Sequence, residues 1–225
     1  MSVKRKIYSK IKNSIEKTWR VVLRYTGDEV SYIYDEEFAN KPWRDKGYTK
    51  EFKDIVFEMY EPESIVDVGC GTGDFLKPFL DEGTNILGID GSKNCFENRK
   101  IPEDKFLVRD LRFESLNIGN FDVCLCMEVA EHIEEKYSNR LIKVVTEASK
   151  NVIFTAATPG QGGVDHVNEK PREWWIEKFR NENFYYMEEK TKVFSDNLSE
   201  IENDNEHDRK SIKNYEKNIM VFEGK

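Results

Sequence analysis

The chain has 225 residues, 38% of them hydrophobic and 35% charged, a length and composition that suit one packed domain of ordinary size. Its formal net charge of -8 disfavours a general nucleic-acid binder, because phosphate backbones attract basic protein faces. No apolar run approaches the roughly 20 residues that span a bilayer, and four cysteines are too few for a secreted disulfide scaffold, so we expect a cytoplasmic protein.

The first 25 residues differ in charge from the rest of the chain. They carry a net charge of +7, which leaves -15 for the other 200 residues out of the total of -8. A basic helix with an apolar stripe can lie on an anionic membrane, dock on an acidic protein or pack on the protein's own acidic body, and we favour the last. The stripe is predicted from spacings of four, four, four and three residues between Ile7, Ile11, Ile15, Trp19 and Val22.

An aromatic and acidic stretch follows at residues 32–38, with Trp43 shortly after it. It is predicted either as a lid over a site or as part of the core. A helix is predicted over residues 49–60, because apolar side chains recur there at i, i+3, i+4 and i+7. We therefore divide the chain into an N-terminal helical extension, residues 1–60, and a main domain, residues 61–225.

From residue 64 onward, short β-rich runs alternate with helical patterns, which predicts an α/β domain with a mostly parallel sheet covered on both faces. The polar stretch at residues 196–208 is predicted as a solvated helix or a loop on the surface. The predicted strands are residues 64–68, 86–90, 106–108, 121–127, 152–156, 184–190 and 218–223, and the predicted helices between them are residues 75–82, 136–149 and 173–181.

The first of these strands runs into a loop with glycines at positions 69, 71 and 73, before a helix that opens near Asp74. Glycine permits positive φ angles and lets a ligand approach the backbone closely. A dinucleotide-binding fingerprint would place its third glycine at position 74, where this chain has an aspartate. Because a carboxylate there would repel a pyrophosphate, the loop favours a cationic ligand.

Acidic residues mark three successive strands: Asp67 in the first, Asp90 at the end of the second and Asp110 after the third. Ligands of open α/β sheets bind at the carboxyl edge, where an acid after the second strand typically accepts hydrogen bonds from a ribose. Asp110 is placed to bind an adenine amino group, with Leu111 against the ring. The pattern therefore predicts a ligand that contains adenosine.

Four features together resemble the class I methyltransferases that use S-adenosylmethionine: the loop Asp67-Val-Gly-Cys-Gly-Thr-Gly73, Asp90, Asp110-Leu111 and the segment Glu128-Val-Ala-Glu-His132. The resemblance implies a Rossmann-like, doubly wound sheet of seven strands, mostly parallel, with the last strand antiparallel. It also implies S-adenosylmethionine as cofactor and S-adenosylhomocysteine as product. The implied cofactor-binding residues are Asp67, Gly69, Cys70, Gly71, Gly73, Asp90, Gly91, Asp110, Leu111, Glu128 and Val129.

The fifth predicted strand leads into a loop at residues 158–168 that reads Thr-Pro-Gly-Gln-Gly-Gly-Val-Asp-His-Val-Asn, and Trp174 and Trp175 follow it. Polar groups beside aromatic rings are a common way to hold a sugar, although one of the two tryptophans is expected in the core. The loop resembles a subgroup of bacterial and large-virus methyltransferases linked with glycan biosynthesis, which implies a sugar or glycan hydroxyl as acceptor. Predicted acceptor contacts are Gln161, Gly162, Asn168 and Trp174.

Other acceptors and functions stay open. A nucleic acid is disfavoured further, because the fourth strand is followed neither by an Asn/Asp-Pro-Pro-aromatic motif nor by a Pro-Cys pair. A small metabolite with a hydroxyl, carboxylate or amine is the second candidate acceptor. The third possibility is a cofactor-binding subunit without turnover that docks on a partner through its basic N-terminal segment.

Three residues are candidates for catalysis: His166, Asp165 and His132. His166 is the predicted general base, because a neutral imidazole can accept a hydroxyl proton near neutral pH. His132 is expected to shape the cofactor pocket. A divalent metal held by the two histidines and nearby acids is an alternative, but no tight ligand spacing supports it, so we predict no metal site. The cysteines are predicted as buried, unreactive thiols.

Overall fold

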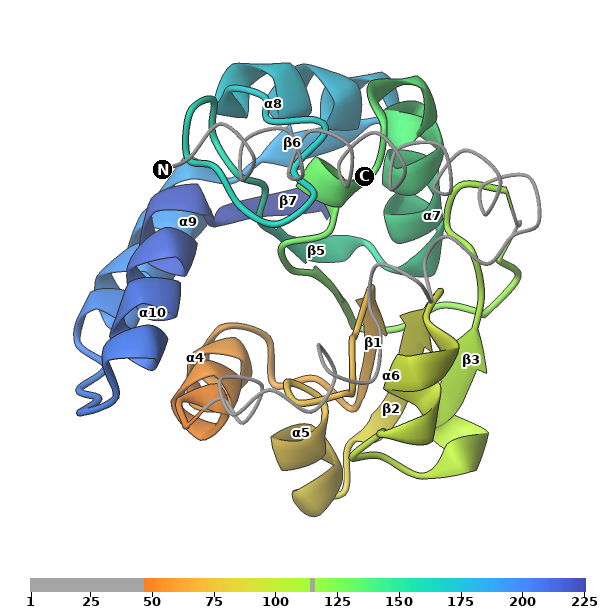
Figure 1. Ribbon diagram of the computed structural model, residues 1–225, viewed down its shortest axis with the longest axis vertical. Coiled ribbons are helices and arrows are strands. Elements are labelled where there is room, and N and C mark those ends of the chain that lie inside the picture. The colour runs from red at the N-terminus through yellow and green to blue at the C-terminus, as the bar shows by residue number, and fades with distance from the viewer. Residues whose placement is uncertain (1–46, 114–115) are drawn as a thin grey trace, which may run out of the picture.

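The computed structural model describes residues 47–113 and 116–225 (Figure 1). The predicted basic helix within residues 1–25 and the aromatic stretch at residues 32–38 with Trp43 lie outside these ranges, so both stay predictions. Within the described ranges, seven strands form one sheet and helices cover both of its faces.

The sheet has the strand order β3-β2-β1-β4-β5-β7-β6. Strands β1 to β5 run parallel to one another, and β7 lies antiparallel between β5 and β6. This arrangement confirms the predicted doubly wound, mostly parallel sheet with an antiparallel last strand. The chain reverses its direction of travel across the sheet between β1 and β4, where such sheets form a ligand crevice. The strands are β1 (Ser64–Val68), β2 (Asn85–Asp90), β3 (Phe106–Val108), β4 (Val123–Cys126), β5 (Asn151–Phe154), β6 (Phe184–Tyr186) and β7 (Met220–Gly224).

Helices α7 and α8 lie on one side of the sheet in Figure 1, and α4, α5 and α6 lie on the other. Helices α9 and α10 come between β6 and β7 in the chain and pack against each other, and α9 also contacts α4 and β7. No helix in the described ranges is long and apolar enough to cross a membrane. The helices are α4 (Thr49–Tyr60), α5 (Lys77–Asp81), α6 (Lys93–Glu97), α7 (Ser138–Ala148), α8 (Arg172–Asn181), α9 (Glu188–Ser199) and α10 (Glu206–Asn218), with short 3-10 turns η2 (Glu103–Lys105), η3 (Ala130–His132) and η4 (Glu135–Tyr137).

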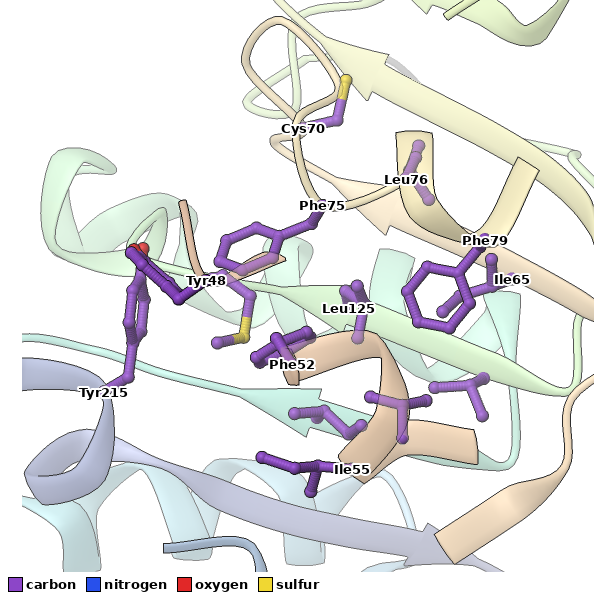
Figure 2. Close-up of a cluster of buried hydrophobic side chains, with 14 of the residues drawn as sticks. Tyr48, Phe52, Ile55, Ile65, Cys70, Phe75, Leu76, Phe79, Leu125 and Tyr215 are labelled. Carbon is purple, nitrogen blue, oxygen red and sulfur yellow. The ribbon is translucent and has the colours of Figure 1, made fainter. Parts of the chain in front are cut away.

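Two apolar cores, one on each face of the sheet, hold these layers together. In β1, Ile65 faces the core that α4, α5, α9 and α10 cover, whereas Val66 and Val68 face the core under α7 and α8. Figure 2 shows the first core, in which the ring centroids of Phe52 and Phe75 lie 4.5 Å apart. Strand β4 is buried at every position, as expected for a parallel strand covered on both faces.

The predicted strand over residues 184–190 is too long. Strand β6 ends at Tyr186, because the chain turns there and α9 begins at Glu188. The other predicted strands and helices overlap observed ones, with ends that differ by one or two residues at most. The sequence pattern does not predict α6, α9 or α10.

The prediction of a solvated surface segment at residues 196–208 is also wrong in part. This stretch contains the end of α9 and the start of α10, and Asp208 within it is buried. The carboxylate of Asp208 accepts a hydrogen bond from the Gly47 backbone N–H at 3.2 Å. Asn205 begins α10 by accepting hydrogen bonds from the N–H groups of His207 and Asp208, a capping signal that the sequence does contain.

Candidate active site

The glycine loop between β1 and α5 forms the first wall of the candidate site. Gly69, Gly71 and Gly73 have φ angles of 86°, 56° and 87°, which side chains rarely allow. A Cβ on Gly69 would lie 2.2 Å from Cγ2 of Val129, so glycine is needed here for Val129 to pack. This contact joins the ends of β1 and β4 and brings two predicted cofactor residues together.

Asp90 fixes the glycine loop beside the end of β2. Its Oδ2 accepts a hydrogen bond from the Gly71 N–H at 2.8 Å, and its Oδ1 accepts one from the Ser92 N–H at 2.8 Å. Asp90 and Gly91 are half-buried, and Asp67 in β1 is fully buried. Two carboxylates therefore lie under the loop, which is a favourable setting for a cationic ligand.

Asp74 has a different role from the predicted one. It is buried, and its carboxylate accepts a hydrogen bond from the Thr72 hydroxyl at 2.5 Å and pairs with the Lys100 ammonium at 2.6 Å. The acid at this position therefore braces the glycine loop internally through a lysine from a distant segment.

Arg112 pairs with the carboxylate that is predicted to meet an adenine. Its Nη2 lies 2.8 Å from Oδ2 of Asp110, and its Nε lies 3.0 Å from Oδ1. This arginine is not among the predicted site residues, although an arginine two residues after an acid is a visible signal. Leu111 between them is buried in the core under α7 and α8.

Glu128 lies at a sharp turn after β4, with a φ angle of 55° that is uncommon for a side-chain-bearing residue. Its N–H donates a hydrogen bond to the Thr155 hydroxyl at 2.7 Å, which ties the end of β4 to the chain after β5. Thr155 is fully buried, and the sequence gives no signal for this role. Backbone conformations of this kind are concentrated at functional sites.

Three side chains from two segments meet beside this turn: Glu131 and His132 of η3, and His166 of the loop after β5. One ligand-type atom of each lies within 4.8 Å of the others, and the two histidine rings have centroids 5.0 Å apart. The backbone holds the two segments together, because the N–H groups of Val167 and Asn168 donate to the Glu131 carbonyl at 2.8 and 3.0 Å. The structure thus brings the two predicted histidines together and adds Glu131.

Burial dominates the electrostatics of Glu131, which has an exposed fraction of 0%. Burial raises the pKa of its carboxyl well above the ordinary value, and the carboxylate of Glu128 nearby raises it further. Neither carboxylate oxygen of Glu131 accepts a well-formed hydrogen bond within the part of the chain that the structure describes, and the neighbouring polar group is the carboxyl of Glu128.

Glu169 organises the loop that carries His166. Its carboxylate accepts hydrogen bonds from the N–H groups of Gly160 and Gly162, both at 2.7 Å, and lies 3.0 Å from Nδ1 of His166. The contact with His166 contributes most to lowering the pKa of Glu169. Glu169 is not among the predicted site residues, although an acid three residues after a histidine is a usable signal. Asp165, a predicted catalytic residue, is half-buried with a φ angle of 58°.

Three of the predicted acceptor contacts lie in this loop, in different surroundings. The Gln161 side chain accepts a hydrogen bond from Nδ2 of Asn218 at 3.0 Å, which links the loop to the end of α10. Gly162 is exposed. Asn168 is buried, and its Nδ2 donates to the Ser138 hydroxyl at 3.0 Å, so this side chain attaches the loop to α7.

Trp174, the fourth predicted acceptor contact, is half-buried on α8. The ammonium groups of Lys170 and Lys178 lie 5.3 and 4.1 Å from its ring centroid. Trp175 has an exposed fraction of 0%, which confirms that one tryptophan of the pair belongs to the core. The ring that a sugar would use is therefore already in contact with two lysines.

Comparison with known proteins identifies the family to which the chain belongs. A family model described as a methyltransferase domain matches residues 41–191. A ubiquinone biosynthesis O-methyltransferase of Rickettsia typhi is 36% identical over 78 residues, which cover 31% of this chain and 30% of that protein. One from Pelagibacter ubique is 33% identical over 104 residues, which cover 42% of this chain and 41% of that protein. The chain thus spans less than half the length of these relatives.

Solved structures are similar in fold. The plantazolicin methyltransferase BpumL, in complex with a monoazolic desmethylPZN analog and SAH, matches with a TM-score of 0.53 and 14% identity over 98% of this chain and 100% of that one. The PH0226 protein from Pyrococcus horikoshii OT3 matches with a TM-score of 0.54 and 15% identity over 83% and 93% of the two chains. At these identities the likeness extends to the fold alone.

Proposed function

Since the chain belongs to the methyltransferase-domain family, we propose that it transfers a methyl group from S-adenosylmethionine to an oxygen of a small-molecule acceptor. The observation that carries the proposal is the glycine loop held by Asp90. Three glycines with positive φ angles leave the backbone open to a ligand, and a carboxylate bonded to the loop lies at the end of β2. The sulfonium ion of S-adenosylmethionine is cationic and carries no phosphate, which suits a loop underlain by Asp67 and Asp90.

Oxygen is the proposed acceptor atom because the curated relatives are named as O-methyltransferases. Their names also place them in ubiquinone biosynthesis, which favours the small-molecule alternative of the sequence analysis over a sugar. A sugar or glycan hydroxyl is the second candidate, supported by the exposed, polar loop around Gly162. We rank it lower because Trp174 already contacts Lys170 and Lys178.

Methyl transfer to a hydroxyl forms an O–CH3 bond, breaks the C–S bond of the sulfonium and releases the hydroxyl proton. The protein must align the three reacting atoms and remove that proton. Glu131, His132 and His166 are ionisable groups that lie together close to the Glu128 turn, so we assign activation of the hydroxyl to this cluster. A subunit that only bound the cofactor would not need such a cluster.

Calorimetry with S-adenosylhomocysteine tests the cofactor. We expect Asp90→Ala to weaken binding by about 10-fold or more, since charge-assisted hydrogen bonds contribute about 1.5–3 kcal/mol. Asp104→Ala removes an exposed acid of η2 and is the matched control, with unchanged affinity expected. Absence of binding by the wild-type chain would overturn the proposal. A screen with methyl-labelled S-adenosylmethionine over small hydroxylated compounds and sugars then decides between the acceptors.

The basic segment at residues 1–25 lies outside the described residues, and packing on the acidic body is our proposal for it. Co-sedimentation with anionic vesicles, with and without these residues, tests the membrane alternative. Equal pelleting of the two forms would support packing on the protein itself or on another protein, and loss of pelleting on truncation would contradict it.

A further inference from the structure

The Glu131 carboxylate and the imidazoles of His132 and His166 form a mixed set of ligand-type groups at the carboxyl edge of the sheet. One oxygen or nitrogen of each lies within 4.8 Å of the other two. Ligand atoms bound to one transition-metal ion are about 3–4 Å apart, because each lies about 2.0–2.2 Å from the ion. Small side-chain adjustments would therefore place all three on one ion. Residues 47–113 and 116–225 contain no other such group of three His, Cys, Asp or Glu side chains.

Glu131 is the first independent sign of a ligand. It has an exposed fraction of 0%, neither of its carboxylate oxygens accepts a well-formed hydrogen bond from the described residues, and its carboxyl lies beside that of Glu128. Leaving a buried polar group without a partner destabilises the folded protein, and a charged group more than a neutral one. A cation between the Glu131 carboxylate and the two imidazoles would give these oxygens a partner and would offset the repulsion between the Glu131 and Glu128 carboxylates.

His166 is the second sign, because it is already oriented by a carboxylate. Its Nδ1 lies 3.0 Å from Glu169, so Nε2, which packs beside Gly163, is the ring nitrogen that a ligand would use. Histidines that bind metals usually donate their second N–H to a carboxylate or carbonyl in this way. Glu169 itself accepts hydrogen bonds from the N–H groups of Gly160 and Gly162, so the carboxylate that orients the ring is positioned by the loop backbone.

The segments that carry the three groups are also joined independently of any ion. The Glu131 carbonyl accepts hydrogen bonds from the N–H groups of Val167 and Asn168. These bonds join the two segments next to the histidines, since His132 follows Glu131 and His166 precedes Val167. Asn168 is further tied to Ser138 of α7. The ligand set is therefore preorganised by backbone contacts, as a binding site requires.

We propose that Glu131, His132 and His166 bind one divalent transition-metal ion that holds the acceptor oxygen for methyl transfer. The role of the ion rests on the proposed function. Two imidazoles and one carboxylate suit Mn²⁺, Fe²⁺, Co²⁺ or Zn²⁺ better than Mg²⁺ or Ca²⁺, which prefer oxygen ligands. Three protein ligands leave coordination positions for a substrate oxygen and water.

The ion lowers the pKa of the acceptor hydroxyl that it binds, and the proton passes to water. A lone pair of the resulting oxygen attacks the methyl carbon, and the electron pair of the C–S bond returns to sulfur. The products are the methyl ether, S-adenosylhomocysteine and one proton. In this assignment His166 acts as a metal ligand and does not take the proton directly.

Titration of the metal-free full chain with Co²⁺, followed by visible absorption, tests the site. We expect saturation at one equivalent. Glu169→Gln should weaken Co²⁺ binding about 10–100-fold, the usual effect of removing a carboxylate that orients a metal-binding histidine. His132→Ala and His166→Ala should weaken it at least as much. His207→Ala, at an exposed histidine of α10, is the matched control and should bind Co²⁺ as the wild type does.

Calorimetry with S-adenosylhomocysteine on the same variants separates this proposal from the function on which it rests. Lost Co²⁺ binding with retained S-adenosylhomocysteine binding supports the site and reports a folded variant. Co²⁺ binding by a chain that does not bind S-adenosylhomocysteine supports the ion site and overturns the cofactor proposal. Equal Co²⁺ affinity in the wild type, His132→Ala and His166→Ala would overturn the site. Undiminished methyl transfer after chelator treatment would overturn the role of the ion and assign His166 as the direct base.

Gly163→Ala tests the participation of His166 even if a histidine variant fails to fold. This change keeps every ligand, but its Cβ would lie 2.2 Å from Nε2 of His166 and must displace the ring. We expect a loss of Co²⁺ affinity that resembles the loss in His166→Ala. Wild-type Co²⁺ affinity in Gly163→Ala would overturn the participation of His166.

Discussion

A comparison of Gly69 with Gly83 distinguishes the cost of an unfavourable backbone angle from the cost of a steric clash. Gly69 and Gly83 both have a φ angle of 86°, but only at Gly69 would a Cβ meet Val129, at 2.2 Å. We expect Gly83→Ala to lower the free energy of unfolding by about 1–2 kcal/mol through the backbone alone. Gly69→Ala should lower it by about 1–3 kcal/mol more, the usual range for overpacking. Urea unfolding measures both losses, and equal values would contradict the Val129 contact.

Glu169 makes the loop after β5 sensitive to pH. Its pKa is lowered in the folded protein, so the ionised form stabilises the loop above the ordinary carboxyl pKa, and this contribution is lost as pH falls through the lowered value. We expect Glu169→Gln to speed hydrogen exchange at the amides of Gly160 and Gly162 near neutral pH by about 10-fold or more, through loss of charge-assisted hydrogen bonds. Glu177→Gln, at an exposed acid of α8, is the control. Unchanged exchange in Glu169→Gln would show that other contacts hold the loop.

Between the elements α9 and β7, a buried hydrogen bond joins a side chain to the backbone, in addition to the ion pair of Lys190 with Glu223. The Thr191 hydroxyl accepts a hydrogen bond from the buried Val221 N–H at 3.0 Å. Thr191→Val keeps the shape of the side chain but removes this acceptor, so we expect the free energy of unfolding to fall by about 1–3 kcal/mol. Thr146→Val in α7 is the matched control, because its hydroxyl donates to carbonyls of its own helix, those of Ile142 and Lys143; we expect a change within about 0.5 kcal/mol. Similar losses in guanidinium unfolding of the two variants would refute a special role for Thr191.

At the scale of the whole molecule, the cysteines report on the integrity of both cores. Cys70, Cys95, Cys124 and Cys126 are all buried, which confirms their predicted burial. Burial raises the pKa of the Cys70, Cys124 and Cys126 thiols well above the ordinary value, and the thiolate is the reactive form. We expect a maleimide to label the native protein at mildly alkaline pH only as fast as the structure opens, whereas the denatured chain reacts at once. Rapid labelling of the native protein would contradict a closed core.

The sequence predicts the sheet well and the helical pair α9–α10 badly, for a physical reason. Strands such as β1 and β4 are buried on both faces, so their apolar runs are visible without knowledge of their neighbours. In α9 the buried positions are only Thr191, Phe194 and Leu198, in a helix that is otherwise charged or polar. The burial of these residues depends on α4 and β7, which are distant in sequence.

Some residues of the candidate site could likewise be predicted from the sequence, and others could not. The glycines, Asp90 and His166 could be predicted, because each carries its chemistry in its residue type and its place after a strand. The contacts of Arg112 with Asp110 and of Glu169 with His166 could have been found from their close spacing. The hydrogen bonds from the glycines to Glu169 could not, because they depend on a turn that folds the chain back on itself. Glu169 reaches Gly160 and Gly162 only because the loop reverses, and Gly162 has a φ angle of 68° there.

The position of β7 between β5 and β6 sets an order of events during protein synthesis. Within the described chain, β6 pairs only with β7, and β7 also covers the edge of β5. The ribosome makes β6 first and then two helices of 12 and 13 residues before β7 follows. During that interval the nascent chain carries an unpaired β6 and an open β5 edge, to which a strand of another chain can add. The nascent protein is therefore most exposed to misassembly while α9 and α10 are emerging, and this exposure ends when β7 is inserted.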